Sequence, residues 1–145
     1  MVTLEPIRRK TIWKSLRLRV TPEQKNFVAP NWESLAQGIG ARLRGREVHF
    51  LAICDGGVPV GFLMVTREEA VWELWRFMIG AEFQHRGYGR QALGLVLEWM
   101  QARGGERCKL SYEPENTPAA ALYRSFGFRE TGELDCGEWV AERPL

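Results

Sequence analysis

The spacing of hydrophobic residues divides the chain into an N-terminal part with helical periodicity and a central part with strand-like runs. In the first 45 residues, apolar side chains recur every three to four positions, which is typical of amphipathic helices. Two glycines, Gly38 and Gly40, weaken the helical prediction near the end of this part. The elements predicted here are a strand over 1–6 and helices over 10–19, from Thr21 and from Asn31.

From residue 48 onward, runs of β-branched and aromatic residues alternate with turn residues. Asp55-Gly56-Gly57 separates the first two runs and indicates a hairpin. After Gly87 the spacing becomes helical again, and Thr117 followed by Pro118 is typical of the start of a further helix. The predicted elements are strands over 48–53, 58–65 and 71–79, a helix from Gly87, a strand over 107–112, a helix over 118–126 and one or two strands over 128–145. This order predicts an α+β or α/β sandwich in which helices cover one sheet.

Composition and charge narrow the class of protein. The chain has 145 residues, of which 45% are apolar, so we expect a single domain over 1–145 with its own core. Lys and Arg number 20 against 18 Asp and Glu, giving a net charge of +2, and the basic residues gather only over 8–19 and 42–46. A nucleic-acid-binding module is therefore a weak alternative. No apolar run of about 18 residues and no signal-peptide core occurs, so we expect a cytoplasmic protein without a membrane partner.

Cysteine and histidine usage argues against a disulfide framework and against a metal site. Cys54, Cys108 and Cys136 are far apart, odd in number and without a C-x-x-C pair, which suits a reducing compartment. The two histidines, His49 and His85, leave any zinc site dependent on widely scattered ligands. We therefore expect no metal cofactor.

The segment Gln84-His85-Arg86-Gly87-Tyr88-Gly89 joins the strand over 71–79 to the next helix and predicts an anion site. A helix N-terminus presents backbone N–H groups without intrahelical partners and a partial positive charge. Glycines without Cβ allow a phosphate to approach the backbone, and Arg86 and Arg90 add positive charge. The segment lacks the third glycine of a dinucleotide fingerprint and the Gly-Lys-Ser/Thr of a Walker loop.

Two motifs together carry a family resemblance. Gln84-His85-Arg86-Gly87-Tyr88-Gly89 matches the pattern Q/R-x-x-G-x-G/A, and the segment 116–128 is similar to N-x-x-A-x-x-L-Y-x-x-x-G-F. Both motifs, and the helix and strand between them, resemble the GCN5-related N-acetyltransferases over most of the chain. The resemblance implies a mixed, mostly antiparallel sheet that is splayed in the middle and has helices on both faces. Within the family, the segments 75–79, 24–30 and 110–116 resemble the bacterial diamine or spermidine/spermine acetyltransferases.

The resemblance implies that the chain binds acetyl-CoA as its cosubstrate. It places the pyrophosphate on the backbone of 86–90, with the Gln84 side chain nearby, and the pantetheine arm along the backbone of Met78 and Ile79. Asn116 would hydrogen-bond the pantetheine amides, because its position before a Thr-Pro helix start leaves its side chain free. A plain turn-forming role is the alternative for this residue. The implied cofactor-binding residues are Met78, Ile79, Gln84, Arg86, Gly87, Tyr88, Gly89, Arg90 and Asn116.

The reaction that the resemblance implies is direct attack of a primary amine on the thioester. An alkylammonium ion, with a pKa of about 10, must first lose a proton, and the departing CoA thiolate must gain one. Tyr123 resembles the family's general acid, with a packing role as the alternative. Glu73 is the candidate base, acting directly or through water, and it could also attract a cationic substrate or be a solvated strand-edge charge. His49 is the other titratable candidate, although a lone histidine in an apolar strand more often belongs to the core.

Strand alternation predicts which residues accompany Glu73. It places Glu73, Trp75, Phe77 and Ile79 on one face of the strand. Trp75 and Glu33 are the candidate substrate-binding residues, because a polyamine or diamine needs carboxylates and aromatic walls around it.

Several alternatives stay open for the function. Instead of a small diamine or polyamine, the acceptor can be a protein N-terminus or lysine, or an aminoglycoside-like amine. A non-catalytic acyl-CoA-binding regulatory domain is the alternative of another class. The resemblance also implies a homodimer, to which the C-terminal strands often contribute in this family.

Overall fold

The computed structural model describes residues 1–7 and 31–145. Each element predicted within these ranges is present, with bounds within a few residues of those expected. The helices predicted over 10–19 and from Thr21 lie outside the described residues. The described elements, in chain order, are β1 (Val2–Pro6), α2 (Asn31–Leu43), β2 (Glu47–Asp55), β3 (Val58–Glu68), β4 (Val71–Ile79), the 3₁₀ helix η2 (Ala81–Phe83), α3 (Tyr88–Ala102), β5 (Arg107–Tyr112), α4 (Thr117–Ser125), β6 (Arg129–Asp135) and β7 (Glu138–Pro144).

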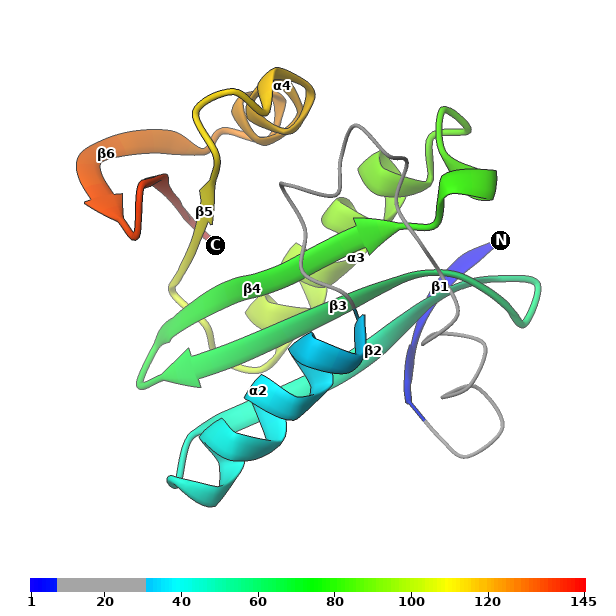
Figure 1. Cartoon of the computed structure of the whole chain (residues 1–145), viewed down its shortest axis with the longest axis horizontal. Coiled ribbons are helices and arrows are strands. Elements are labelled where there is room, and N and C mark those ends of the chain that lie inside the picture. The colour runs from blue at the N-terminus through cyan, green and yellow to red at the C-terminus, as the bar shows by residue number, and fades with distance from the viewer. Residues whose placement is uncertain (8–30) are drawn as a thin grey trace.

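The seven strands of the described part form one sheet in the order β1-β2-β3-β4-β5-β7-β6. Neighbouring strands are antiparallel except β4 and β5, which run parallel. Helix α2 lies against one face of the sheet and α3 against the other (Figure 1). The mixed, mostly antiparallel sheet with helices on both faces is confirmed.

Two apolar clusters hold the helices on the sheet. The larger joins α3 and α4 to one face of the sheet and surrounds the fully buried Trp72. The smaller lies on the opposite face and includes Phe50, Phe62 and Met64, with Leu35 of α2 packed against it. Burial of each such side chain contributes roughly 1.5–3 kcal/mol before the entropy of ordering is subtracted, so both faces help to hold the sheet in place.

Gly38 explains why α2 keeps a residue that lowers helix propensity. A Cβ at this position would lie 2.4 Å from two ring carbons of Phe50 and 2.8 Å from the Met64 sulfur. The glycine therefore lets the helix backbone approach the sheet more closely than any other residue would. The cost in helix propensity, about 1 kcal/mol relative to alanine, is the smaller of the two effects.

A β-bulge at Trp75 changes which side chains of β4 share a face. Along the β3–β4 pair, Arg76 lies opposite Met64 and Leu74 lies opposite Val65, so Trp75 has no partner on β3. The prediction that Glu73, Trp75, Phe77 and Ile79 lie on one face is therefore wrong. Trp75 packs against the α2-side cluster, whereas Phe77 and Ile79 pack against the α3-side cluster. An extra residue in a bulge resets the alternation of the strand, and the sequence pattern alone does not show it.

Candidate functional site

The strands β4 and β5 separate after a short region of pairing. Val71–Glu73 of β4 pair with Arg107–Lys109 of β5, and no other residues of these two strands pair with each other. The rest of β5 pairs with β7 on its other side, and the rest of β4 pairs with β3. The sheet is thus splayed in the middle, as predicted, and the β4 edge from 74 to 79 faces the opening.

The loop after β4 directs a helix N-terminus toward this opening. Gly87 has φ 82° and His85 has φ 62°, so the chain turns through left-handed conformations immediately before α3. Glycine adopts φ above zero without the steric cost that a Cβ brings, which accounts for its place here. The N–H of Gln91 donates to the Gly87 carbonyl at 3.1 Å as the first helical bond. The N–H groups that precede it have no acceptor within the helix, so this end of α3 suits an anion.

Two hydrogen bonds fix the loop on the sheet. The Gln84 side-chain amide donates to the Ile79 carbonyl at 2.9 Å, across the end of β4. The Gly80 N–H donates to the Val60 carbonyl at 2.8 Å, toward β3, so by strand alternation the polar groups of the Ile79 backbone point toward the splay. Gln84 therefore lies in the loop after β4 and orients the end of that strand.

Tyr88, in the first turn of α3, donates its phenolic hydrogen to Asp55 Oδ2 at 2.6 Å. This bond lowers the pKa of Asp55 and raises the pKa of Tyr88. The Tyr88 side chain thus ties the helix start to the end of β2.

The arginines that flank the loop are exposed but packed on aromatic rings. The Arg86 guanidinium lies 5.9 Å from the centre of the Phe83 ring, and that of Arg90 lies 5.4 Å from the Phe126 ring. Arg90 also donates to the Ser125 hydroxyl at 3.1 Å, joining α3 to α4. Both cations therefore remain near the helix N-terminus, where an anion would gain from their charge.

Asn116 corrects one detail of the sequence analysis. The helix cap is Asn116 rather than Thr117, since the Asn116 Oδ1 accepts from the Ala119 N–H at 3.4 Å. Its side chain is therefore engaged by α4, and the expectation that a Thr-Pro cap leaves it free is wrong. Asparagine is among the strongest N-cap residues, which explains why it displaces the threonine.

Tyr123 of α4 is buried at the edge of the larger cluster. Its ring centre lies 5.8 Å from that of Tyr112 on β5 and 5.9 Å from that of Phe128. Burial raises the pKa of the Tyr123 phenol above its usual range, and the nearby Cys108, Glu138 and Tyr112 raise it further. The phenol therefore stays protonated throughout the neutral range and can act as a proton donor.

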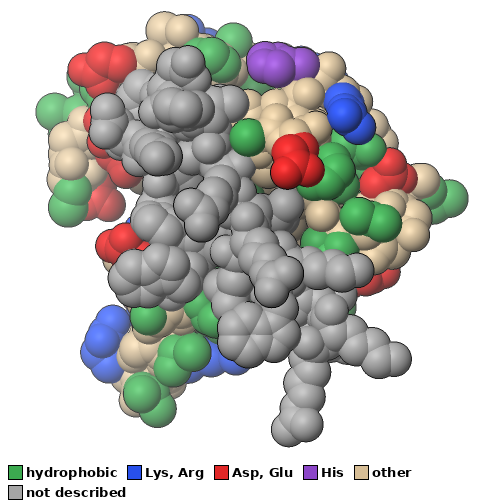
Figure 2. Space-filling view, turned by 45° about the vertical axis from the view of Figure 1, so that its right-hand side comes forward, with side chains coloured by type: hydrophobic (Ala, Val, Ile, Leu, Met, Phe, Trp, Pro, Cys, Tyr) green, Lys and Arg blue, Asp and Glu red, His purple; other side chains and the backbone are tan. Residues whose placement is uncertain are grey.

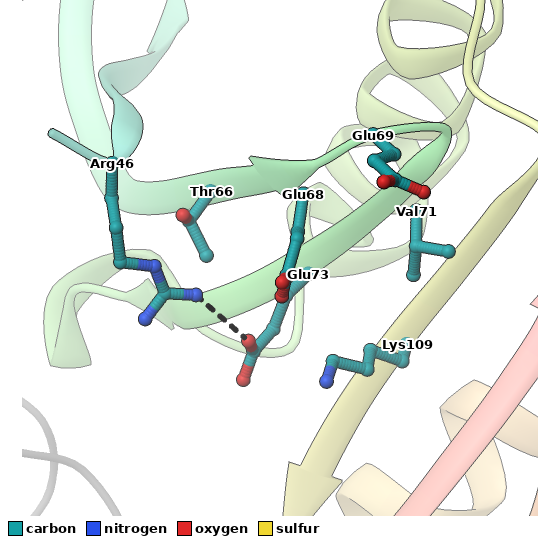
Figure 3. Close-up of a pocket in the computed structure, with 7 residues that line it drawn as sticks. All are labelled: Arg46, Thr66, Glu68, Glu69, Val71, Glu73 and Lys109. Atoms are coloured by element: carbon teal, nitrogen blue, oxygen red, sulfur yellow. Dashed lines mark ion pairs between the residues drawn. The ribbon is translucent and has the colours of Figure 1, made fainter.

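Glu73 lies in a cavity of about 280 Å³ on the α2 face of the sheet. Its Oε2 is 3.9 Å from an Arg46 guanidinium nitrogen, and Figure 3 shows Lys109 reaching from β5 toward it. Thr66 of β3 lies opposite Glu73 and is 1% exposed, and its hydroxyl has no hydrogen-bond partner among the described residues. The residues that line the cavity are Arg46, Thr66, Glu68, Glu69, Val71, Glu73 and Lys109.

The other predicted site residues lie at separate places in the described structure. Trp75 is half-buried on the α2 side, with the Arg46 guanidinium 5.8 Å and the Arg76 guanidinium 5.7 Å from its ring centre. Glu33 is half-buried in the first turn of α2, and neither it nor Trp75 lines the Glu73 cavity. Met78 is buried in the α2-side cluster and lies opposite Phe62 of β3.

His49 lies on the other side of the sheet from Glu73. Its ring contacts Trp72 and Trp99, with ring centres 5.8 Å and 5.0 Å apart, and its Nε2 is 3.0 Å from a Glu47 carboxylate oxygen. The ring is partly buried among the α3-side aromatics. This packing agrees with the interpretation of His49 as a residue of the core rather than with a role as the catalytic base.

The sequence analysis missed a group of polar residues beside the splay. Arg76 of β4 donates to the Gln37 side chain of α2 at 2.8 Å. On β5 the Ser111 hydroxyl donates to Glu138 Oε2 of β7 at 3.4 Å. No local motif marks these residues, because the strand order brings together positions far apart in the chain. The nearest signal was the Cys136-Gly137 pair, which indicates a hairpin turn before Glu138.

Charges are distributed over the described surface. Figure 2 shows acidic and basic side chains at separate places among hydrophobic and neutral ones on the visible face. Within residues 1–7 and 31–145, no three His, Cys, Asp or Glu side chains come close enough to hold a metal ion. No helix in the same ranges is both long and apolar enough to cross a membrane.

A family comparison explains this arrangement. The family model described as "Acetyltransferase (GNAT) family" matches residues 13–128. The chain belongs to the GNAT acetyltransferase family.

Individual relatives of this GNAT chain differ in the substrates that their names give. It is 33% identical over 88 residues to the N-alpha-acetyltransferase RimI of Mycobacterium tuberculosis, covering 58% of this chain and 54% of that one. It is 31% identical over 84 residues to a mycothiol acetyltransferase of Corynebacterium glutamicum, covering 57% and 29%. The chain thus spans about half or less of the length of these curated relatives.

The fold matches a solved family structure along its whole length. The PaiA N-acetyltransferase of Thermoplasma acidophilum, solved in complex with coenzyme A, superposes with a TM-score of 0.78 at 15% identity, covering 100% of this chain and 99% of that one. The curated relatives named above are an N-alpha-acetyltransferase and a mycothiol acetyltransferase, and they do not single out the diamine or polyamine branch that the sequence motifs resemble.

Proposed function

We propose that this GNAT chain transfers the acetyl group of acetyl-CoA to a primary amine. One observation carries the proposal: an open β4 edge leads to a left-handed glycine turn and the N-terminus of α3, with a buried tyrosine on α4 alongside. The unpaired strand edge suits the amides of a pantetheine arm, and the helix N-terminus suits a pyrophosphate. Acetyl-CoA, when bound, supplies the activated thioester.

The residues proposed to hold acetyl-CoA act mainly through their backbone. The Met78 and Ile79 backbone would pair with the arm, and Gln84 keeps the strand end in place through its bond to the Ile79 carbonyl. The N–H groups at the start of α3 would bind the pyrophosphate. The full proposed set is Met78, Ile79, Gln84, Arg86, Gly87, Tyr88, Gly89, Arg90 and Asn116.

Tyr123 is the proposed general acid. Its phenol stays protonated because burial raises its pKa, so a hydrogen is available for the departing thiolate. The contacts to Tyr112 and Phe128 fix the direction of the ring. The α4 helix lies beside the glycine loop, since Arg90 of α3 bonds to Ser125.

Glu73 is the proposed base. Its carboxylate lies in an accessible cavity on the α2 face, paired with Arg46 at 3.9 Å, and can take a proton from an acceptor amine directly or through water. The Arg46 contact engages one carboxylate oxygen and leaves the second available.

The acceptor that we propose first is the α-amino group of a protein or peptide. The relative named an N-alpha-acetyltransferase supports this class. Trp75 and Glu33, which lie on the α2 side of the sheet, are the proposed contacts for the acceptor.

A diamine or polyamine is the second candidate acceptor. The cavity around Glu73 favours it, because the Glu68, Glu69 and Glu73 side chains give the lining three carboxylates against two cationic side chains. Glu68 and Glu73 line the same cavity, drawn in Figure 3, so an ammonium group within it would meet their negative charge.

The assembly and compartment complete the proposal. Every residue of the edge strand β6 is exposed, which leaves that edge open to a second copy of the chain. Three free cysteines suit a reducing cytoplasm. Analytical ultracentrifugation tests the dimer, and a single monomer species would contradict it.

The decisive experiment measures thiol release from acetyl-CoA with several acceptors. We compare four acceptors, which are a peptide with an N-terminal alanine, spermidine, 1,4-diaminobutane and an aminoglycoside. The Tyr123→Phe variant is measured beside the wild type. We expect turnover with the peptide and a fall of about 100-fold or more in kcat for Tyr123→Phe. Tyr112→Phe is the matched control, because it removes a neighbouring phenol that bonds to Glu130 instead.

Each other result has a defined meaning. Turnover with the diamines alone would select the second acceptor, and turnover with the aminoglycoside alone would overturn both acceptor classes. Binding of acetyl-CoA without turnover of any acceptor would favour the non-catalytic regulatory alternative.

A further inference from the structure

Glu138 begins β7 directly after a tight turn. Cys136 and Gly137 have φ values of 49° and 83°, the left-handed pair of a two-residue hairpin turn. The turn places Glu138 opposite Asp135 on β6. On the neighbouring strand β5, the Ser111 hydroxyl donates to Glu138 Oε2 at 3.4 Å. The side chain is therefore held on the β5 side of its own strand.

This position lies beside the splay of the sheet. Ser111 belongs to the part of β5 beyond the residues that pair with β4. Tyr112 follows Ser111, pairs with Trp139 of β7 and contacts the Tyr123 ring. The negative charge of Glu138 is close enough to raise the pKa of Tyr123. Ser111 and Tyr112 point to opposite faces of the sheet, so Glu138 and the proposed general acid lie on opposite faces beside the same opening.

The surroundings of Glu138 leave its charge poorly balanced. Burial is the largest cause that raises its pKa, and the carboxylates of Glu113 and Asp135 raise it further. The Arg76 guanidinium and the Ser111 hydroxyl oppose this effect, but the pKa stays above its usual value. Within the described residues Glu138 forms no ion pair, whereas Glu73 pairs with Arg46. A cation placed here would restore the balance.

We propose that the Glu138 carboxylate binds the ammonium group of the acceptor and determines specificity for cationic acceptors. This inference rests on the proposed function and adds the residue that recognises the amine before it reacts. Glu138 holds the charged amine at the splay, on the face opposite Tyr123, and Ser111 fixes the carboxylate for that contact. Glu73 remains the proposed base, so the two carboxylates have separate tasks.

The two tasks separate kinetically. A residue that only anchors the acceptor changes its KM, whereas a base changes kcat. For Glu138→Gln, which keeps the size of the side chain, we expect the acceptor KM to rise about tenfold or more, with kcat changed little. Glu138→Asp keeps the charge and should restore part of the affinity. The acceptor KM of the wild type should rise as pH falls through the Glu138 pKa, and this step should vanish in Glu138→Gln.

A binding measurement keeps the test independent of turnover. Alanine amide and 1,4-diaminobutane are titrated into the CoA-saturated protein by calorimetry, with neutral N-acetylalanine amide as the control probe. We expect the cationic probes to bind the wild type. Their affinity for Glu138→Gln should be lower by about tenfold or more. Glu142→Gln is the matched control protein, since Glu142 lies on the same strand in an ion pair with Arg107.

The outcomes separate this inference from the proposed function. Unchanged probe affinity and KM in Glu138→Gln, with normal turnover, would overturn the anchor and leave the function standing. A loss of kcat at constant KM would also overturn it, because Glu138 would then be the base. Selective loss of probe binding in a protein that turns over no acceptor would support the anchor while the proposed transfer fails. A wild type that binds neither cationic probe rejects the anchor.

Discussion

The Asn116 side chain accepts a hydrogen bond from the Ala119 N–H at 3.4 Å, and so the residue proposed to contact pantetheine also begins helix α4. The same helix carries Tyr123 seven residues later. One side chain therefore links the position of the proposed general acid to the proposed cofactor contact.

Substitution at Asn116 should separate these two roles. Asn116→Ala removes the cap, and we expect it to cost about 1 kcal/mol of unfolding free energy and to raise the acetyl-CoA KM. Asn116→Asp keeps the capping oxygen but loses the amide donor, so stability should be retained while the KM still rises. Urea unfolding and acetyl-CoA kinetics measure the two effects. Equal kinetics for Asn116→Asp and the wild type would remove Asn116 from the cofactor site.

The two glycines of α2 should respond to alanine in opposite directions. A Cβ at Gly38 would lie 2.4 Å from the Phe50 ring, so we expect Gly38→Ala to destabilise the fold by about 1–3 kcal/mol. At Gly40 the nearest atom is an Arg44 nitrogen at 3.5 Å, so Gly40→Ala should stabilise it by about 0.5–1 kcal/mol. Thermal unfolding compares the pair. A stabilised Gly38→Ala variant would show that α2 does not need its close approach to the sheet.

Of the two glycines of the anion loop, only Gly87 should be sensitive to alanine. Gly87 has φ 82°, and we expect Gly87→Ala to cost about 1–2 kcal/mol of stability. Gly89 lies inside α3, and a Cβ there would make ordinary contacts of 3.8 Å and 3.9 Å with Leu122 and Ile79. Gly89→Ala should therefore leave unfolding by urea nearly unchanged. If the two variants were equally stable, backbone strain would not explain the glycine at position 87.

The raised pKa of Glu138 makes a prediction about stability and pH. Because the folded protein holds this proton more tightly than the unfolded chain, the contribution of Glu138 is full below the ordinary glutamate pKa and is lost as pH rises through the folded pKa. Glu138→Gln should match the wild type in acid and become the more stable protein toward neutral pH. Urea unfolding from about pH 4 to 8 tests this. A stability difference between Glu138→Gln and the wild type that does not change with pH would argue against a desolvated carboxylate at Glu138.

The sequence predicted the sheet, the loop and the family because those features depend on local patterns. Gln84 and Gly87 belong to one short motif between a strand and a helix, and the structure places both as expected. Alternation and helical spacing fixed the element order for the same reason.

The features that the sequence did not predict depend on pairing between distant segments. Ser111 and Glu138 meet only because β7 inserts between β5 and β6, which no spacing along the chain reveals. Asn116 and Thr117 are both good N-cap residues, so the sequence alone does not show which of them caps α4. The local backbone geometry decides this. The sequence also does not show that Gly38 lies against the Phe50 ring, which is the reason that a Cβ does not fit there.

Trp75, the residue of β4 without a partner on β3, limits how the length of this strand can change. Deletion of Trp75 would bring Leu74 and Arg76, which lie opposite Val65 and Met64, next to each other and restore uninterrupted alternation along β4. Phe77, Met78 and Ile79 would then keep their present sides, and only the contact of Trp75 with the α2-side cluster would be lost. An insertion between Trp75 and the glycine loop would shift the strand end that Gln84 holds. This end of β4 should therefore tolerate loss of the bulge residue far better than an insertion.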